Sequence, residues 1–124
     1  MAQDMRSRRE MLEDRLIDFT IAVNIMVEKL PKTYLGKTLA NQLSRSSTSP
    51  ALNYGEAQAA ESTKDFIHKM RIGLKELRET MVGIKIINRA SMFDNDQEIL
   101  ELKKEVNELI SIYVTSIKTA IKRL

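Results

Sequence analysis

Apolar residues recur along this chain at alternating steps of three and four, which is the spacing of one face of an α-helix. The first periodic run lies within residues 12–30, and three further runs lie within residues 34–60, 62–89 and 96–124. The chain has only four Gly and two Pro in 124 residues, so few turns can separate the runs. The pattern predicts an all-α fold, an antiparallel up-and-down four-helix bundle with short connections. The first run comprises Leu12, Leu16, Phe19, Val23, Met26 and Leu30.

Proline and capping residues predict where the helices begin and end. Pro31 lacks the amide hydrogen that a helix interior needs, so it predicts the end of the first helix. Pro50 falls inside the second run, but helix-forming residues resume directly after it, and one helix bent at Pro50 is predicted. Ser62 and Asn95 are predicted N-caps of the third and fourth helices. Residues 10–124 are expected to form a single domain, preceded by a flexible basic N-terminus over residues 1–9.

Composition indicates a cytoplasmic protein. The chain contains no Cys, so disulfides and thiolate chemistry are excluded and a reducing compartment is expected. The charged N-terminal residues lack the apolar stretch of a secretory signal. The longest uncharged apolar run, residues 19–27, is far shorter than a membrane-spanning helix, so no contact with a membrane is expected.

Residues with catalytic or metal-binding chemistry are almost absent. A single His and no Cys exclude a zinc site, and a di-iron bundle needs two Glu-x-x-His motifs where this chain has one Asp65-x-x-His68. The serines and threonine of residues 44–49 have no positioned base, and no glycine-rich phosphate loop is present. We therefore predict no enzyme activity, no cofactor, no metal and no small-molecule substrate.

Basic residues follow one line along the third predicted helix. The acidic residues of this segment, Asp65, Glu76 and Glu79, lie off that line. A line of charges is most often a solvated face, but its length also suits the phosphates of structured RNA or DNA. In the functional interpretation the N-terminal arginines add to it. The candidate nucleic-acid-binding residues are Lys64, His68, Arg71, Lys75, Arg78, Lys85, Arg89, Arg6, Arg8 and Arg9.

A second line of polar residues, at steps of four, four and three, follows one face of the second predicted helix. It could be a solvated stripe, but such stripes usually consist of Lys and Glu rather than Ser and Asn. We favour a half-buried structural network that sets the register between helices, with a partner on the third helix. The candidate residues are Arg45, Ser49, Asn53, Glu56 and Glu79.

Some apolar residues exceed what the core of one bundle needs. They are either flanking core positions or a subunit interface, because exposed apolar patches usually mark contacts. The candidate interface residues are Ile17, Ile21, Ile25, Ile112 and Val114.

A set of residues within 42–80 forms a motif: Gln42-Leu43-Ser44-Arg45, Ser49, Asn53, Glu56, Ser62, Phe66-Ile67 and Glu79. This motif resembles the S23 family, the four-helix-bundle proteins encoded by intervening sequences in bacterial 23S ribosomal RNA genes. The family's typical proline falls one position later than Pro50, and Lys75-Glu76 replaces its small Gly-Ser pair. The resemblance implies a four-helix protomer that assembles into a homopentameric barrel and carries no enzyme activity. It also implies relatedness to the accessory variability protein of diversity-generating retroelements, a basic pentamer that binds nucleic acid and a reverse transcriptase.

Two functions remain open at this point. The first is a non-enzymatic oligomeric scaffold that binds structured RNA or other nucleic acid through basic helix faces. The alternative is a protein-binding assembly module, for example an accessory to a reverse transcriptase, with no direct role in nucleic-acid binding.

Overall fold

The computed structural model describes residues 5–124, and these residues form four α-helices and no β-strand. The all-α fold with four helices that the sequence predicted is confirmed. Consecutive helices pack against each other, whereas α1 and α4 meet far less extensively. The helices are α1 (Arg8–Val27), α2 (Tyr34–Gln58), α3 (Thr63–Arg89) and α4 (Asp96–Ile121).

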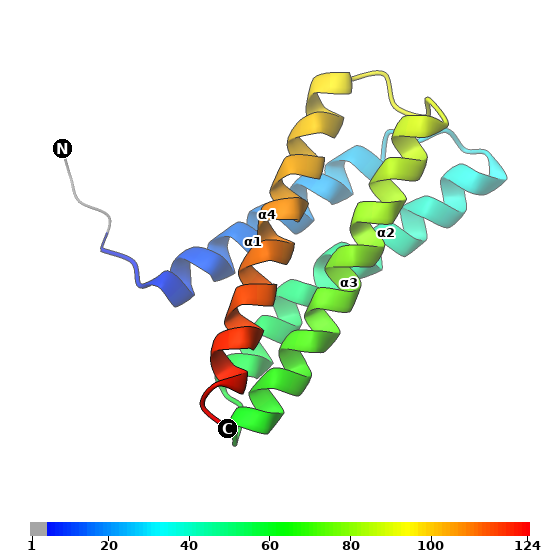
Figure 1. Ribbon diagram of the computed structural model, residues 1–124. Helices are drawn as coiled ribbons and strands as arrows, with labels where there is room; N and C mark the ends of the chain where they lie inside the picture. Colours follow the sequence, from blue (N-terminus) through cyan, green and yellow to red (C-terminus); the bar gives the residue numbers. More distant parts are fainter. Residues whose placement is uncertain (1–4) are drawn as a thin grey trace.

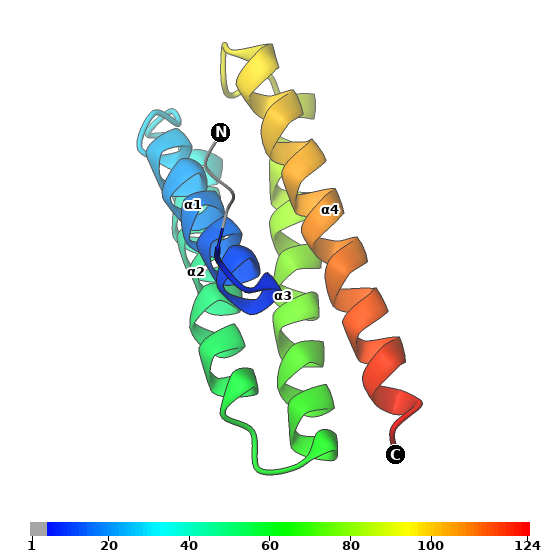
Figure 2. The same cartoon turned by 90° about the vertical axis from the view of Figure 1, so that its left-hand side faces the viewer.

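The short connections reverse the chain between neighbouring helices. Figure 1 shows α3 and α4 side by side, with the chain turning back in the loop that joins them. The quarter-turn in Figure 2 shows α1 and α2 on one side of the molecule and α4 on the other. A salt bridge links the two outer helices: Arg15 of α1 donates Nε to Glu105 Oε2 of α4 at 3.1 Å. The hydrogen bond to Glu105 raises the pKa of the Arg15 guanidinium above its usual value, so this guanidinium keeps its charge.

Polar side chains cap the start of every helix. Ser62 accepts a hydrogen bond from the Asp65 amide at 3.1 Å, and Asn95 accepts one from the Glu98 amide at 3.0 Å, which confirms both predicted N-caps. Thr33 caps α2 in the same way. These side chains satisfy backbone donors that have no partner within the helix.

The first helix begins two residues before the predicted domain boundary at residue 10. Ser7 and Glu10 form a reciprocal capping box, so α1 begins at Arg8, within the segment predicted to be flexible. The domain boundary itself stays a prediction. Residues 1–4 of that segment lie outside the described part of the chain, and the flexibility of the rest stays a prediction.

The two prolines act differently. Helix α1 ends at Val27, before Pro31, which lacks the amide hydrogen that a continued helix would need for a bond to the carbonyl of Val27. Pro50 is buried within α2, which continues as one helix from Tyr34 to Gln58, as predicted. Burial against the neighbouring helices offsets the backbone hydrogen bond that Pro50 removes.

The core contains apolar residues of the predicted periodic runs. All six apolar residues of the first run are buried, and α4 buries seven residues at the same alternating spacing. On α3, two glycines allow close packing. A Cβ atom at Gly73 would lie 2.7 Å from Cε2 of the buried Tyr113 ring, and one at Gly83 would lie 2.5 Å from Cδ2 of Leu43. Glycine therefore sets the distances from α3 to α4 and to α2.

Substituting these glycines tests the close packing. We expect Gly73→Ala to lower the melting temperature, because overpacking costs about 1–3 kcal/mol while the gain in helix propensity is about 1 kcal/mol. Gly55→Ala is the matched control, since nothing lies within 4 Å of its Cβ. It should raise the melting temperature by a few degrees. Thermal unfolding followed by circular dichroism measures both, and equal stabilisation by the two substitutions would contradict the close approach.

Candidate nucleic-acid interface

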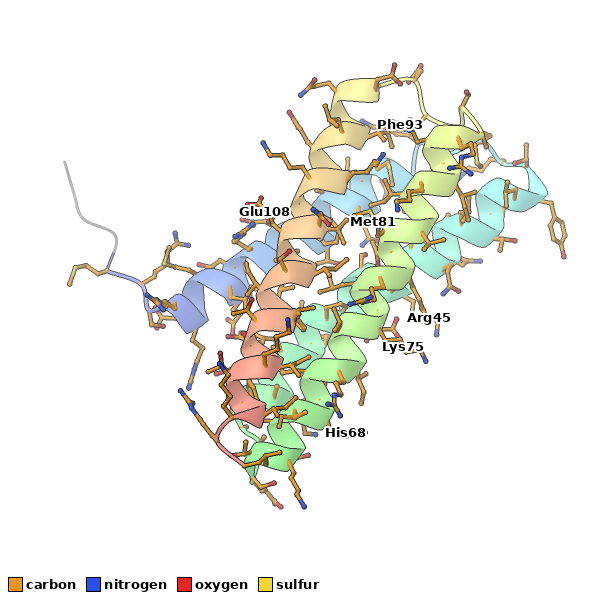
Figure 3. All side chains as sticks on the ribbon, viewed as in Figure 1. Arg45, His68, Lys75, Met81, Phe93 and Glu108 are labelled. Atoms are coloured by element: carbon orange, nitrogen blue, oxygen red, sulfur yellow. The ribbon has the colours of Figure 1, made fainter. Side chains whose placement is uncertain are left out.

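The seven basic residues predicted on the third helix all lie exposed on α3. Figure 3 shows His68 and Lys75 projecting to the same side of the helix. The exposed Val82 occupies the gap between Arg78 and Lys85. None of the seven forms an ion pair with any of the residues that the structure describes. We call this line the α3 basic face; it comprises Lys64, His68, Arg71, Lys75, Arg78, Lys85 and Arg89.

The N-terminal arginines line a different feature. Arg8 and Arg9 border a cavity of about 670 Å³ at one end of the bundle, and no residue of the α3 basic face lines it. Arg123, from the other end of the chain, also lines this cavity, together with hydroxyl side chains such as Ser116. Arg6 instead pairs with Asp14 at 2.6 Å. The structure therefore divides the predicted basic residues between two surfaces.

Sequence reasoning missed Arg123, because no periodic pattern connects a C-terminal residue with the first turn of α1. The folded arrangement of the helix ends brings them to one cavity.

A groove of about 620 Å³ runs between α2 and α3. Its apolar lining includes Leu39 of α2 and Leu74, Val82, Gly83 and Ile86 of α3. The middle of the α3 basic face borders this groove through Arg71, Lys75 and Arg78, and Gln42 and Glu79 complete the lining. We call it the α2–α3 groove. The basic residues at its edge thus lie beside an apolar surface, not on an isolated charged face.

The five residues of the predicted polar network do not form a single network in the structure. Asn53 is buried and donates Nδ2 to the carbonyl of Lys69 at 2.7 Å, which ties α2 to α3. Arg45 is exposed and donates to Gln42 at 3.0 Å.

Among the described contacts, Asn53 forms no hydrogen bond with the remaining three residues of that prediction. Gln42 also donates to Glu79, at 3.4 Å, so Arg45 and Glu79 share a partner without touching. Glu56 is exposed and Ser49 is half-buried. The reason is that α3 covers this face of α2 around Asn53 but leaves Arg45 and Glu56 open to water.

Part-buried polar contacts come instead from the hydroxyl-rich segment of α2. Thr48 shares a hydrogen bond with Thr20 of α1 at 2.7 Å, and Ser44 donates to Asn24 Oδ1 at 2.7 Å. The predicted polar network included only Arg45 and Ser49 of this segment. The missed signal was Thr20 and Asn24, two polar residues that interrupt the apolar first helix.

One further hydroxyl pair lies in the core. Ser46 and Thr80 are fully buried and share a hydrogen bond at 2.8 Å between α2 and α3. Because an unpaired buried hydroxyl is costly, these pairs fix the register of α2 against both of its neighbours.

Glu76 is the one described residue with a buried side-chain oxygen, Oε2, that lacks a hydrogen-bond partner. Burial raises the pKa of its carboxyl above the usual value, and the charge of nearby Glu79 raises that pKa further. Arg45 and Lys75 act in the opposite direction on the same pKa. A strained carboxylate therefore lies between α2 and α3, close to the α2–α3 groove.

The predicted interface residues also separate. Ile17, Ile21 and Ile25 are exposed along one face of α1, which we call the α1 ridge. Ile112 instead packs against the core from α4, and Val114 is half-buried. Of the five predicted interface residues, the three of the α1 ridge form a continuous exposed apolar surface.

The structure reveals no metal-binding or membrane-spanning feature in its described part. Within residues 5–124, no group of three or more His, Cys, Asp or Glu side chains is placed to hold a metal ion. None of the helices in that range combines the length and apolar character that crossing a membrane requires.

Comparisons with known proteins agree with the fold. The sequence model of a family described as 23S rRNA-intervening sequence protein matches residues 13–115. A crystal structure of a protein of unknown function from the S23 ribosomal protein family of Bacteroides thetaiotaomicron VPI-5482 superimposes with a TM-score of 0.77 at 25% identity. The match covers 90% of this chain and 99% of that one. A search of curated proteins finds no match.

Removing the charge of Glu76 should stabilise the protein. We expect Glu76→Gln to raise the melting temperature slightly at neutral pH, because a partly buried charge beside Glu79 is removed and the amide can donate to Glu79. The raised pKa means that protonation favours the folded state. The stabilising effect of Glu76→Gln should therefore shrink as the pH falls towards the usual carboxyl value of 4.5.

Thermal unfolding at pH 7 and pH 4 measures this difference. Glu56→Gln, at an exposed position on α2, is the control and should change the melting temperature little at either pH. If Glu76→Gln changes the stability equally at both pH values, the charge of the Glu76 carboxylate is not the cause of the effect.

Proposed function

The chain belongs to the 23S rRNA-intervening sequence protein family, and we propose that it is a non-enzymatic oligomeric scaffold that binds structured RNA. The observation that carries the proposal is the α3 basic face, seven exposed basic side chains without ion-pair partners in the described structure. Unpaired cations on one face attract the phosphates of a nucleic acid and release its counterions.

The geometry favours contacts with the RNA backbone over reading of bases. From Lys64 to Arg89 the α3 basic face extends over about 38 Å at 1.5 Å per residue. Of the three tyrosines, Tyr54 and Tyr113 are buried in the core, and the exposed Tyr34 begins α2, so none of them lies on the α3 basic face. Phosphate contacts supply affinity without sequence information. The proposed ligand is therefore a structured RNA recognised by its shape and charge.

Oligomerisation would multiply this weak surface. We propose that each protomer is an antiparallel up-and-down bundle within a homopentameric barrel, in the bacterial cytoplasm. The family resemblance and the exposed α1 ridge support this assembly. Several basic faces on one particle would bind one RNA together, with an avidity above that of a single protomer.

The second candidate function is a protein-binding assembly module, for example an accessory to a reverse transcriptase. The α2–α3 groove favours it, because exposed apolar surfaces on proteins usually mark contacts with other proteins. A protein partner that stays bound after nuclease treatment and in high salt would support this candidate over the first.

Charge reversal at the ends of the α3 basic face tests RNA binding. We expect the triple variant Lys64→Glu, Lys85→Glu, Arg89→Glu to weaken binding of a structured RNA at least tenfold. The slope of log Kd against log salt concentration should fall by about three, because three phosphate contacts are lost. Fluorescence anisotropy across a salt series measures both quantities.

The matched control carries the same change of charge elsewhere. Lys37→Glu, Lys104→Glu, Lys122→Glu alters exposed lysines of α2 and of the α4 region by the same total. It should reduce binding much less than the α3 variant does. Equal losses in the two variants would assign binding to net charge alone, and negligible binding by the wild type at low salt would refute the proposal.

The oligomer is tested by mass in solution. Multi-angle light scattering at micromolar concentration should give five times the protomer mass of 14.2 kDa. A stable monomer under these conditions would contradict the proposed assembly, whatever the RNA measurement shows.

A further inference from the structure

Two apolar surfaces lie exposed on different helices of the chain. The α1 ridge exposes Ile17, Ile21 and Ile25 at 41%, 52% and 49% of their side-chain area. The α2–α3 groove exposes Val82 at 55% and Ile86 at 39%, above a floor that includes Leu39 and Leu74. Neither surface is covered by any other helix of the chain, so both remain available to a partner.

Acidic residues continue the line of the α1 ridge at both ends. Glu10, Asp14, Ile17, Ile21, Ile25 and Glu28 follow one another at steps of four, three, four, four and three, which keeps them on one helix face. Asp14 already pairs with Arg6. Glu28, and Asp18 beside the ridge, form no ion pair within the described structure.

The α2–α3 groove carries the opposite charge. Arg71, Lys75 and Arg78 line it, and none of them has an ion-pair partner among the described residues. Glu79 is the one carboxylate in the lining, and it accepts a hydrogen bond from Gln42. An apolar ridge with acidic ends thus matches an apolar groove with a basic edge.

The two surfaces also match in length. The line from Asp14 to Glu28 covers about 21 Å of helix, and the groove residues from Arg71 to Ile86 cover about 22 Å, at 1.5 Å per residue. A helix whose apolar face enters a groove between two other helices is a common mode of recognition. One helix of this chain therefore has the shape and charge that the groove requires.

We propose that the α1 ridge of one copy docks in the α2–α3 groove of the next copy. This inference rests on the proposed homo-oligomer and names the two surfaces that build it. The contact is heterologous, because each copy offers its ridge to one neighbour and its groove to the other, as in a closed ring.

A symmetric dimer is disfavoured by the same charges. In a symmetric contact of two ridges, Asp18 and Glu28 of one copy would face the acidic residues of the other copy. In a symmetric contact of two grooves, Arg71, Lys75 and Arg78 would face the same basic residues of the other copy. Like charges that face each other across an interface are repulsive. Either symmetric arrangement would also leave one apolar surface of each copy uncovered.

The proposed contact divides the α3 basic face between two tasks. Arg71, Lys75 and Arg78 face the acidic residues of the docked helix. Lys64, His68, Lys85 and Arg89 lie outside the groove lining and stay available to RNA. The RNA-binding variant described above was chosen from these outer positions, so that it leaves the contact between copies intact.

Two single substitutions and their mixture test the contact. Ile21→Asp places a charge on the ridge, and Val82→Asp places one in the groove; both positions are about half exposed, so the protomer should still fold. Each variant alone should run as a monomer in light scattering. Mixed in equal amounts, they should form a heterodimer of twice the protomer mass, because one intact ridge meets one intact groove.

The control and the contrary outcomes are distinct. Leu52→Asp, at an exposed apolar position outside the groove lining, should leave the oligomer unchanged. If only one of the two variants dissociates the oligomer, or if the mixture stays monomeric, the ridge-to-groove contact is refuted. If both variants keep the wild-type mass, the oligomer stands but uses other surfaces. A monomeric wild type would refute the proposed assembly itself, which separates the two failures.

Discussion

The close approach of α3 to both of its neighbours determines how the rest of the molecule is arranged. Gly73 lets the helix reach the ring of Tyr113 on α4, and Gly83 lets it reach Leu43 on α2. Because the inner face of α3 packs against both α2 and α4, its Lys and Arg residues lie on the side that faces water. The outer helix α1 then packs chiefly on α2 and keeps its isoleucines exposed. The two surfaces on which the functional proposals rest thus follow from how tightly the central helix is packed.

The fold could be predicted because helical periodicity and capping are local signals. The seam from Leu12 to Leu30 is buried as its spacing indicates, and Ser62 and Asn95 cap the helices that they precede. The start of α1 was not predicted, since the capping box of Ser7 and Glu10 went unrecognised. Such boundaries depend on one or two hydrogen bonds, which apolar patterning does not report.

The candidate site was predictable only in part. Steps of three and four placed the basic residues of α3 on one exposed face, because that arrangement depends on a single helix. The division of Arg8 and Arg9 from that face, and their meeting with Arg123, depend on how helix ends are arranged in space. The polar residues predicted on one face of α2 do lie along that helix, but they do not form one hydrogen-bonded network. The neighbouring α3 covers Asn53 and leaves Arg45 exposed. Contacts between helices are not encoded in the spacing along either one.

The weak attachment of α1 has a thermodynamic consequence. This helix packs mainly on α2 and is tied to α4 by the partly exposed pair of Arg15 and Glu105. Segments with few tertiary contacts open locally at a lower free energy than the rest of a domain, so the amides of α1 should exchange with solvent ahead of those in α3. An assembly that covers α1 would give this helix the contacts that it lacks within its own chain. Folding and association would then be linked equilibria, and the apparent stability of the protein would rise with its own concentration.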